Sequence, residues 1–305
     1  MNKRKQYLWA VLGCMMLTGM TACSSDDDTT DIPDDGVKVR RITITQTDDA
    51  AARQMLTRST LVESDGLTAS WTAGDGLTYC NLSRTNPMNY EIYTGPLTAA
   101  STASTSQFTG NVTCNAGDYL AVVYPAATFE TNESYTISLS GQDGTLGTLA
   151  TNYHYVYGKA YVTSVTDNTA NATMEKMKSL LTVCKFSFVN KDGGAVIPIQ
   201  TLTIAYGGTG SDAGTYPQTA TVAIGANTAQ TDVHATGVDG STPLAVTCPS
   251  AQDAVFVALL PTSGQRTFNF TVTDGSDNTY TGMAKATLTE GEYIVATGLK
   301  LTKNN

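Results

Sequence analysis

Histidine, the side chain best suited to acid–base chemistry at neutral pH, is scarce in this chain. Its two histidines are His154 and His234. His154 lies in an alternating aromatic run in which residues two apart share one face of a strand, so we predict a structural role for it. His234 lies near a glycine-rich turn, and we predict that it is exposed to solvent. No Gly-x-Ser-x-Gly motif is present, and a nucleophile needs both a neighbouring base and an orienting group. These residues therefore predict no catalytic triad.

Pairs of carboxylates could serve a glycoside hydrolase, because that chemistry needs two acids at a defined separation. Each candidate here stands beside a glycine, a serine or the end of a predicted strand, where an acid most often caps a turn. The candidates are Glu63, Asp65, Asp75, Asp118 and Asp253. Residues 274–278 also place oxygen atoms on a tight turn, but they lack the spacing of an EF-hand. We therefore predict no enzyme, no metal site and no cofactor.

Four cysteines remain besides Cys14 and Cys23: Cys80, Cys114, Cys184 and Cys248. An oxidising exterior permits disulfides, and four thiols allow three complete pairings that the sequence does not distinguish. Cys184 alternates with Phe186 and Phe188, so a buried free thiol is an equally open alternative for it.

The chain begins with a pattern typical of an export signal. Lys3, Arg4 and Lys5 precede an apolar run over residues 7–17, and small residues follow up to Cys23. The apolar run is shorter than the roughly 20 residues that a permanent membrane helix needs. This order of charge, short apolar stretch and small residues predicts a cleaved signal peptide over residues 1–22.

Residues 20–23, Met-Thr-Ala-Cys, resemble the lipobox of bacterial lipoproteins, in which the cysteine becomes a lipidated N-terminus. The resemblance implies a lipid anchor at Cys23, and two or more acyl chains such as palmitate make such an anchor stable. Residues 24–28 are Ser-Ser-Asp-Asp-Asp, and they resemble the acidic signal that sends lipoproteins to the outer face of the outer membrane. A plain acidic linker is the alternative. We expect a surface lipoprotein of the cell outer membrane with a flexible tether over residues 23–36.

Charge and length narrow the choice of partners and the number of domains. The net charge of the whole chain is −9, and loss of the three positive charges in residues 1–22 takes it to −12. An acidic balance argues against nucleic acid and anionic lipid as partners, because both require clustered Lys and Arg. The 283 residues that remain suit two domains better than one.

The first half of the chain reads as a series of strands. Residues 37–46 place apolar side chains on odd and then on even positions, which predicts a strand with a bulge near Arg40 and Arg41. Residues 67–71 and 77–82 flank a turn at 72–76, a strand–turn–strand arrangement, and Trp71 is predicted to lie in the core. Further strands are expected over residues 90–93, 107–108, 119–124, 135–139 and 153–162.

A second series of strands begins near residue 181, after a short helix predicted over residues 173–180. We take that helix as the connection between domains over residues 37–178 and 179–305. Residues 118–125 and 253–261 support two related units, since each is an apolar strand that opens near an aspartate and closes on a proline. The strands expected in the second unit cover residues 181–189, 199–205, 219–224, 244–247, 254–260, 267–272, 279–288 and 293–301. Short strands at this spacing predict a sandwich or barrel.

Several of these segments together resemble the fimbrillin family, the subunits and accessory proteins of type V pili. They are Cys23 with its acidic tail and residues 56–59, 70–77, 119–125, 180–189 and 199–204. The likeness covers nearly the whole mature chain, and its most specific motifs are the Trp-x-x-Gly-Asp element and the strand that ends in Tyr-Pro. The resemblance implies an all-β fold of two tandem transthyretin-like (Ig-like Greek-key) β-sandwich domains.

The resemblance also implies assembly by exchange of strands. A trypsin-like protease would cut after Arg58, with Arg53 as the second candidate, and the first strand, residues 37–46 of a pro-segment 37–58, would leave its groove. A strand from another pilin subunit would fill the groove by β-strand addition. The alternative is that Arg58 is an ordinary exposed loop arginine. Stalk pilins donate C-terminal strands, whereas only residues 302–305 follow the last predicted strand here, so we expect a tip, an anchor or a standalone lipoprotein.

These observations predict a non-enzymatic fimbrillin-like surface lipoprotein that acts in adhesion, in a fimbrium or at the cell surface. The main alternative is a monomeric surface lipoprotein that binds a glycan or a host protein, and a hydrolase is the third reading. An apolar groove beneath the strand with Ile42 and Ile44 would favour the pilus subunit. A shallow pocket lined by exposed tyrosines would favour the glycan binder.

Overall fold

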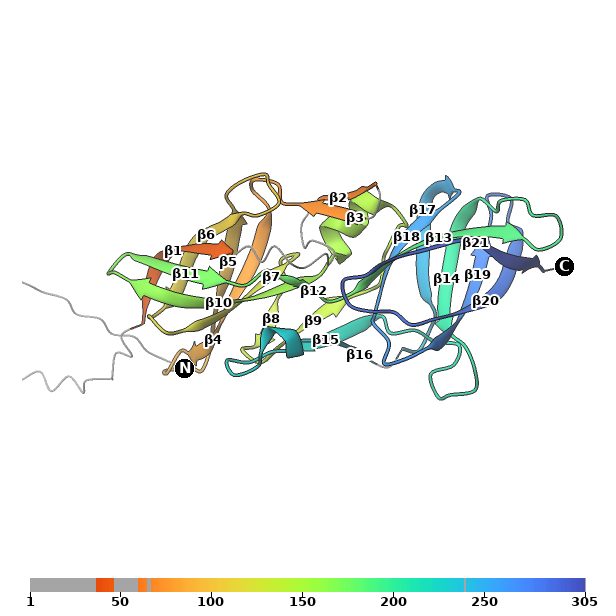
Figure 1. The fold of residues 1–305 in the computed structure, drawn as a ribbon. Helices are drawn as coiled ribbons and strands as arrows, with labels where there is room; N and C mark the ends of the chain where they lie inside the picture. Colours follow the sequence, from red (N-terminus) through yellow and green to blue (C-terminus); the bar gives the residue numbers. More distant parts are fainter. Residues whose placement is uncertain (1–36, 47–59, 65–66, 239, 305) are drawn as a thin grey trace, which may run out of the picture. The chain divides into compact units, whose positions relative to one another are not determined.

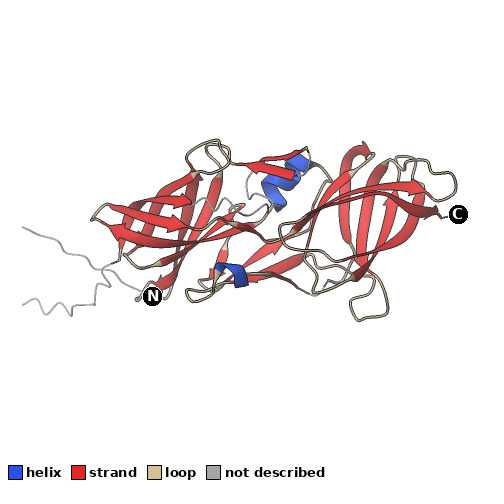
Figure 2. Ribbon diagram, viewed as in Figure 1, coloured by secondary structure: helices blue, strands red, loops and turns tan. Residues whose placement is uncertain are grey.

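The computed structural model describes residues 37–46, 60–64, 67–238 and 240–304. Strands dominate these residues, as Figure 2 shows. The helical elements among them are short: α1 (Leu146–Thr148), the π-helical turn η1 (Leu149–Tyr153) and the 3-10 turn η2 (Gln230–Asp232). Within the described ranges, no helix has the length and apolar character needed to cross a membrane. The prediction of an all-β chain is confirmed.

The first large sheet closes on itself (Figure 1). Its strands follow the order β11-β1-β6-β5-β4-β7-β10-β12, and β11 also pairs with β10. Seven strands therefore form a barrel-like ring in which β11 contacts both β1 and β10. The strands are β1 (Lys38–Gln46), β4 (Gly76–Thr85), β5 (Ile92–Ala99), β6 (Gln107–Cys114), β7 (Tyr119–Tyr124), β10 (Val156–Val165), β11 (Thr169–Met174) and β12 (Lys178–Ser179).

Alternating apolar residues fill the interior of this closed sheet. Ile42 and Ile44 from β1 are fully buried there. Trp71 joins them, with its ring centroid 5.0 Å from that of Phe108 and 5.4 Å from that of Tyr124. Both contacts have the edge-to-face geometry that aromatic pairs prefer. The prediction that Trp71 lies in the core is confirmed.

The second large sheet has the order β17-β14-β19-β20-β21-β13-β18. β20 and β21 pair at two positions only, Tyr280 with Lys303 and Thr281 with Thr302. Phe186 on β13 lies 5.3 Å from Phe270 on β19 between ring centroids, so strands that are not neighbours pack face to face in a sandwich-like manner. The strands are β13 (Thr182–Asn190), β14 (Ile199–Tyr206), β17 (Leu244–Gln252), β18 (Val255–Leu259), β19 (Arg266–Thr273), β20 (Thr279–Ala286) and β21 (Tyr293–Lys303).

Two smaller sheets complete the described fold. One has the order β16-β15-β9-β8 and the other is the pair β2-β3. In the first of them β9 pairs with β15, a strand that lies more than 80 positions later in the chain. Contacts of this kind place residues 36–305 in one compact unit. The strands are β2 (Thr60–Glu63), β3 (Leu67–Ser70), β8 (Phe129–Thr131), β9 (Ser134–Ser138), β15 (Thr219–Ala223) and β16 (Ala235–Gly237).

The segment after β9 bridges β17 and β18, the two end strands of the seven-stranded sheet. The amide of Thr247 donates to the carbonyl of Gln142, and the amide of Phe256 donates to the carbonyl of Gly144. The buried Gln142 side chain also donates to the carbonyl of Ala258 and accepts from its amide, at 3.0 and 2.7 Å. Because a buried amide side chain must satisfy its own donors and acceptors, Gln142 is well suited to join these two strand edges.

The helix predicted over residues 173–180 is wrong. β11 runs through Met174, the chain continues without regular structure, and Lys178–Ser179 forms β12. Met174 pairs with Ala160 in the antiparallel register of β10 and β11, and both Met174 and Met177 are buried. Two buried methionines three residues apart imitate the spacing of a helix, although the backbone that carries them is extended or irregular.

The strands predicted on either side of the turn at 72–76 are present, but they do not pair with each other. β3 pairs with β2, whereas β4 pairs with β5 and β7. The turn itself forms, because the amide of Thr72 donates to Oδ2 of Asp75 at 2.6 Å and Gly74 takes a positive φ of 95°. Trp71 forms a bridge with Ala103 instead, so the chain passes from one sheet to another at this turn.

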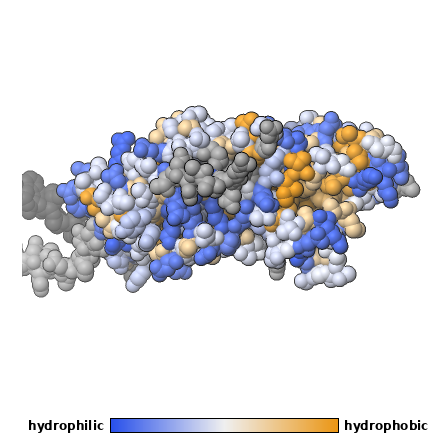
Figure 3. Space-filling model, viewed as in Figure 1, coloured by the Kyte–Doolittle hydropathy of each residue, from blue (hydrophilic) through white to orange (hydrophobic). Residues whose placement is uncertain are grey.

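Large apolar side chains on the surface are scattered. The most exposed include Val39, Met88, Tyr90 and Met283. On the face drawn in Figure 3, hydrophilic residues predominate and apolar residues gather in small separate patches. Single exposed apolar residues are normal on the surfaces of folded proteins and need no functional explanation.

Replacement of Gly144 by alanine should destabilise the protein by about 1–3 kcal/mol. Gly144 has a positive φ of 76°, and a Cβ atom there would lie 2.8 Å from Cγ1 of Val255. The measurement is urea unfolding of Gly144→Ala beside Gly147→Ala, since a Cβ at Gly147 meets nothing within 4 Å. Equal unfolding midpoints for the two variants would contradict the role of this segment.

Candidate functional site

β1 lies inside the closed sheet, between β6 and β11, and pairs along both of its edges. It runs antiparallel to β6 from Lys38 to Thr45 and parallel to β11 from Arg41 to Gln46. An unpaired strand edge is a template for pairing with another chain. The place that β1 occupies, which we call the β1 slot, therefore has two strand edges that would be free without it.

The side chains of β1 follow one uninterrupted alternation, so the bulge predicted near Arg40 and Arg41 is wrong. The register with both neighbours is continuous. Arg40, Ile42 and Ile44 are buried, whereas Val39 is 66% exposed. The apparent change of phase arose because a charged residue takes an inward position that an apolar residue usually holds.

Arg40 is a buried cation that is tied to backbone carbonyls at one end of the slot. Its Nε donates to the carbonyl of Thr166 at 2.7 Å, and its Nη1 donates to the carbonyls of Lys38 and Cys114. Nη1 also lies 3.3 Å from Oδ1 of Asn115. A buried guanidinium needs such acceptors to offset its lost hydration. Arg40 thus fixes β1 against β6 and against the turn after β10, a role that the sequence analysis missed.

Small residues on β11 lie beside the two isoleucines of β1, whereas on β6 Ile44 lies in register with the large side chain of Phe108. Ile42 lies in register with Gly110 on β6 and Ala170 on β11, and Ile44 lies beside Ala172 on β11. Both isoleucines are fully buried. Without β1, the slot would expose apolar pockets at alternate positions of its floor, and an incoming strand would need large aliphatic side chains two residues apart to fill them.

Glu63, at the end of β2, is bound from the second large sheet. Lys185 Nζ on β13 lies 2.8 and 2.7 Å from its two carboxylate oxygens, and the Tyr293 hydroxyl on β21 donates to Oε1 at 2.6 Å. The hydrogen bond from Lys185, and then that from Tyr293, lower the pKa of the Glu63 carboxyl below its usual value, while burial opposes them. The segment that begins at Thr60 is therefore held to the body of the protein independently of β1.

One of the two histidines, His154, is buried, and the other, His234, is exposed on the surface. His154 is buried directly before β10, so it lies in the turn that leads into the strand rather than on the strand itself. His234 is exposed, as predicted, with 58% of its side chain accessible, and its Nδ1 lies 2.8 Å from Oε1 of Glu290.

Three of the five carboxylates considered for hydrolysis, Glu63, Asp75 and Asp118, have hydrogen-bond or ion-pair partners within the protein. Asp118 is buried and lies 2.7 Å from Nε of Arg84, and Asp75 accepts in the turn described above. Asp274 accepts from backbone amides of its own hairpin turn, which confirms that residues 274–278 form a turn. Asp65 lies outside the described residues. Across the described ranges, no group of three or more His, Cys, Asp or Glu side chains could hold a metal ion.

Cys80, Cys114, Cys184 and Cys248 are free thiols, and each is buried. Burial raises the pKa of Cys80 and Cys184 to about 12 and that of Cys114 to about 11. Because the thiolate is the reactive form, these side chains act as small apolar core residues. The sequence left either a disulfide or a buried free thiol open for Cys184, and in the structure Cys184 is a buried free thiol.

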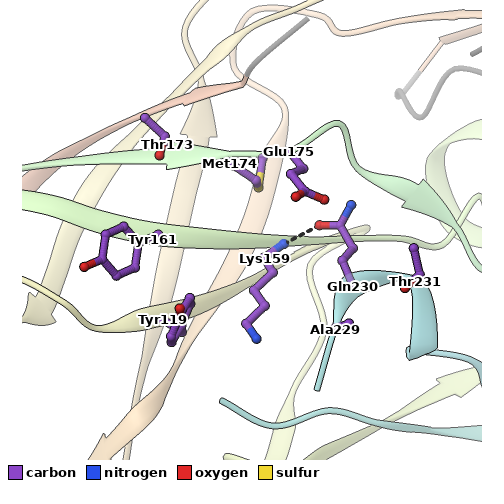
Figure 4. Close-up of a pocket in the computed structure, with 9 residues that line it drawn as sticks. All are labelled: Tyr119, Lys159, Tyr161, Thr173, Met174, Glu175, Ala229, Gln230 and Thr231. Carbon is purple, nitrogen blue, oxygen red and sulfur yellow. Dashed lines mark hydrogen bonds between the residues drawn. The ribbon is translucent and has the colours of Figure 1, made fainter. Parts of the chain in front are cut away.

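A pocket of about 480 Å³ lies on the outer face of the closed sheet (Figure 4). Tyr119 on β7 and Tyr161 on β10 line it and are 36% and 43% exposed. The structure thus contains both features by which the sequence analysis separated its two main readings, an apolar slot beneath Ile42 and Ile44 and an open pocket with tyrosines. Three residues predicted as modification sites, Cys23, Arg53 and Arg58, lie outside the described residues.

The fold and the slot together define a class of protein: an all-β chain with sandwich- and barrel-like sheets whose first described strand completes a closed sheet. No protein-family model matches the sequence, and no curated protein matches it either. The fold can therefore be compared only with solved structures.

A crystal structure described as a "putative cell adhesion protein" from Bacteroides uniformis has the same fold. The two align with a TM-score of 0.51 and 16% identity, over 89% of this chain and 98% of that one. A second protein so described, from Bacteroides fragilis, aligns with a TM-score of 0.44 and 10% identity, over 87% of this chain and 97% of that one. The tip fimbrial protein Mfa3 from Porphyromonas gingivalis aligns with a TM-score of 0.35 and 8% identity, over 81% of each chain. The first of these comparisons shows a shared fold, which is consistent with the resemblance to the fimbrillin family.

Truncation of Ile42 or Ile44 to alanine should lower the free energy of unfolding by about 2–5 kcal/mol, because each change leaves a cavity in a close-packed core. Val39→Ala on the same strand is the matched control, since Val39 is 66% exposed, and it should stay within about 0.5 kcal/mol of the wild type. Chemical denaturation measures all three. A cost at Val39 equal to that at Ile42 would contradict the alternation described here.

Stability should fall below about pH 5 in a way that depends on Glu63. Because the folded pKa of Glu63 is lowered, its contribution is present above the unfolded pKa and is lost as pH falls through the folded pKa. Glu63→Gln should therefore be less stable than the wild type at pH 7, and the difference should shrink between about pH 5 and pH 3. Glu91→Gln, at an exposed glutamate, is the control. A difference that stays constant with pH would contradict the assignment.

Proposed function

We propose that this chain is a non-enzymatic, fimbrillin-like subunit or accessory protein of a pilus, which acts in adhesion and assembles by exchange of its first strand. The observation that carries the proposal is the position of β1. This strand pairs on both edges and buries Ile42 and Ile44 in the interior of the closed sheet. A strand from another subunit with the same alternation could satisfy the same backbone groups and fill the same pockets.

We retain the division into two tandem transthyretin-like sandwich domains, residues 37–178 and 179–305, as part of this proposal. All strands of the closed sheet lie between Lys38 and Ser179, and all strands of the seven-stranded sheet lie between Thr182 and Lys303. The proposed boundary falls at β12, the last strand of the first sheet. The pairing of β9 with β15 and the bridge through Gln142 would then be contacts between the two domains.

Proteolysis after Arg58, or after Arg53, would separate β1 from the rest of the chain. The new N-terminus would lie at Ser59 in the first case, next to β2, which Glu63 attaches to Lys185 and Tyr293. The body of the protein would keep this attachment while the segment 37–58 leaves. The lipid on Cys23 would leave with it, so the anchor in the outer membrane would hold the precursor at the cell surface until it is cut.

The position of the C-terminal strand favours a subunit that accepts a strand. β21 pairs with β13 over most of its length and with β20 at its end, so it is an internal member of its sheet. Withdrawal of β21 for donation to a neighbour would open the second sheet. We therefore propose a tip, an anchor or another accessory position in the pilus in preference to a stalk position.

Limited trypsin digestion of the folded precursor tests this proposal. Digestion should release the segment that carries β1, leave Ser59 or Gln54 as the N-terminus and convert the monomer to oligomers, measured by N-terminal sequencing and size-exclusion chromatography. Arg40 and Arg41 should resist cutting, because they lie in a strand that is paired on both sides and proteases require an unpaired segment.

A double variant, Arg53→Gln with Arg58→Gln, is the matched control and should remain uncut and monomeric. A synthetic peptide of residues 37–46 should block oligomerisation of the cut wild type by refilling the slot. The same peptide with Ile42 and Ile44 replaced by serine should not. The proposal fails if the cut chain stays monomeric or if its new N-terminus is at neither expected residue.

A further inference from the structure

The pocket with Tyr119 and Tyr161 is an open pocket on the outer face of the closed sheet, and it is separate from the β1 slot. Figure 4 shows the two tyrosine rings at one end, Glu175, Gln230 and Thr231 at the other, and Lys159 between them. Strands β7, β10 and β11 form one wall, and the turn η2 forms the other. Its volume of about 480 Å³ lies in the range of small-molecule sites.

The two tyrosines form an exposed aromatic platform. Tyr119 and Tyr161 are directly opposite each other on β7 and β10, and their ring centroids lie 5.3 Å apart with 49° between the ring planes. Each remains more than a third exposed. A pair of neighbouring exposed aromatic rings is an apolar surface with a polar edge, which suits a ligand that is itself amphipathic.

Hydrogen bonds hold the floor of the pocket in place before any ligand binds. Lys159 Nζ donates to the carbonyls of Ala226 and Thr228 at 2.6 and 2.8 Å. The amide of Lys159 donates to Oε1 of Gln230 at 2.7 Å, and Nε2 of Gln230 donates to the carbonyl of Lys176 at 2.6 Å. The loop that carries η2 is therefore fixed to β10, and a pre-organised site saves a ligand the cost of ordering it.

The same contacts decide which charge the ligand can carry. The ammonium of Lys159 already has two carbonyl acceptors, and it lies 4.4 Å from the centroid of the Tyr119 ring. It is thus committed to partners within the protein and is poorly placed to pair with an anion. An incoming cation would meet this ammonium at the ring where a cation would otherwise bind. A neutral ligand avoids both conflicts.

We propose that this pocket binds a neutral saccharide of one or two rings. The C–H face of a sugar ring would stack on Tyr161, with the tilted ring of Tyr119 along its edge. Its hydroxyl groups would donate to the carboxylate of Glu175 and exchange hydrogen bonds with the hydroxyl of Thr231, both of which are exposed at the other end of the pocket. This site does not depend on strand exchange, so it stands or falls separately from the proposed assembly.

We test the proposal by binding of the purified chain to a glycan array. The array carries neutral mono- to tetrasaccharides that end in galactose, mannose, fucose or N-acetylhexosamine. Affinities for the best binder are then measured by saturation-transfer NMR on the purified uncut chain. Tyr161→Ala should weaken binding roughly tenfold or more, the effect of losing one ring contact and its buried area. Glu175→Gln should weaken it less, because the amide can still accept a hydrogen bond.

Tyr90→Ala is the matched control, since Tyr90 is 81% exposed and lies outside the pocket, and it should bind as the wild type does. The proposal is overturned if no neutral saccharide on the array binds above background. It is also overturned if Tyr161→Ala binds unchanged, or if sialylated glycans or lysine-rich peptides bind and neutral ones do not. Polymerisation after trypsin treatment should be the same in Tyr161→Ala as in the wild type, which separates this test from that of the proposed assembly.

Discussion

Closure of the first sheet depends on β1, because this strand joins β6 to β11. Every other neighbouring pair of strands in the ring can form without β1, including the pairing of β10 with β11. A strand that belongs to a closed sheet must present one face to the interior. This explains why Arg40, Ile42 and Ile44, which share one face of β1, are all buried. The proposed function of the chain rests on the same arrangement.

The second half of the protein gives the first half a stable platform. β9 pairs with β15, Gln142 joins the ends of the seven-stranded sheet, and Lys159 is bound to carbonyls of the loop before η2. None of these contacts involves β1. The remainder of the protein is therefore held together by interactions that would persist if the β1 slot were empty.

Much of the fold was predictable because alternation of apolar residues survives in the strands. The strand over residues 119–124 was located to the residue, and Pro125 marks its end because proline has no amide to continue the ladder. Arg40 was misread because an inward-facing charge looks like an interruption, and only its carbonyl partners, such as that of Thr166, explain its burial. The prediction of a helix over residues 173–180 is wrong for a related reason, since Met174 and Met177 are buried by pairing and packing against β10.

The candidate sites also contain some residues that the sequence predicts and others that only the structure identifies. Ile42 and Ile44 could be recognised from the local pattern, but the small residues opposite them, Gly110 and Ala170, become meaningful only once the register is known. Lys159 and Gln230 carry no sequence signal that joins them, because their contact depends on how η2 folds against β10. Local spacing thus predicts which residues face inward, and tertiary pairing decides what they meet there.

The long separation between β1 and β11 also sets an order of folding. Arg40 contacts Thr166 across 126 positions of sequence, whereas the pairs β4–β5, β5–β6 and β10–β11 join segments that are close in the chain. Contacts that close short loops form before those that close long ones, because the entropy lost on closure grows with loop length. Of the described strands, β1 is the first to be synthesised, and by this argument it is among the last to pair along both edges. A strand that enters late, into a framework that is already built, can be replaced without unfolding the remainder.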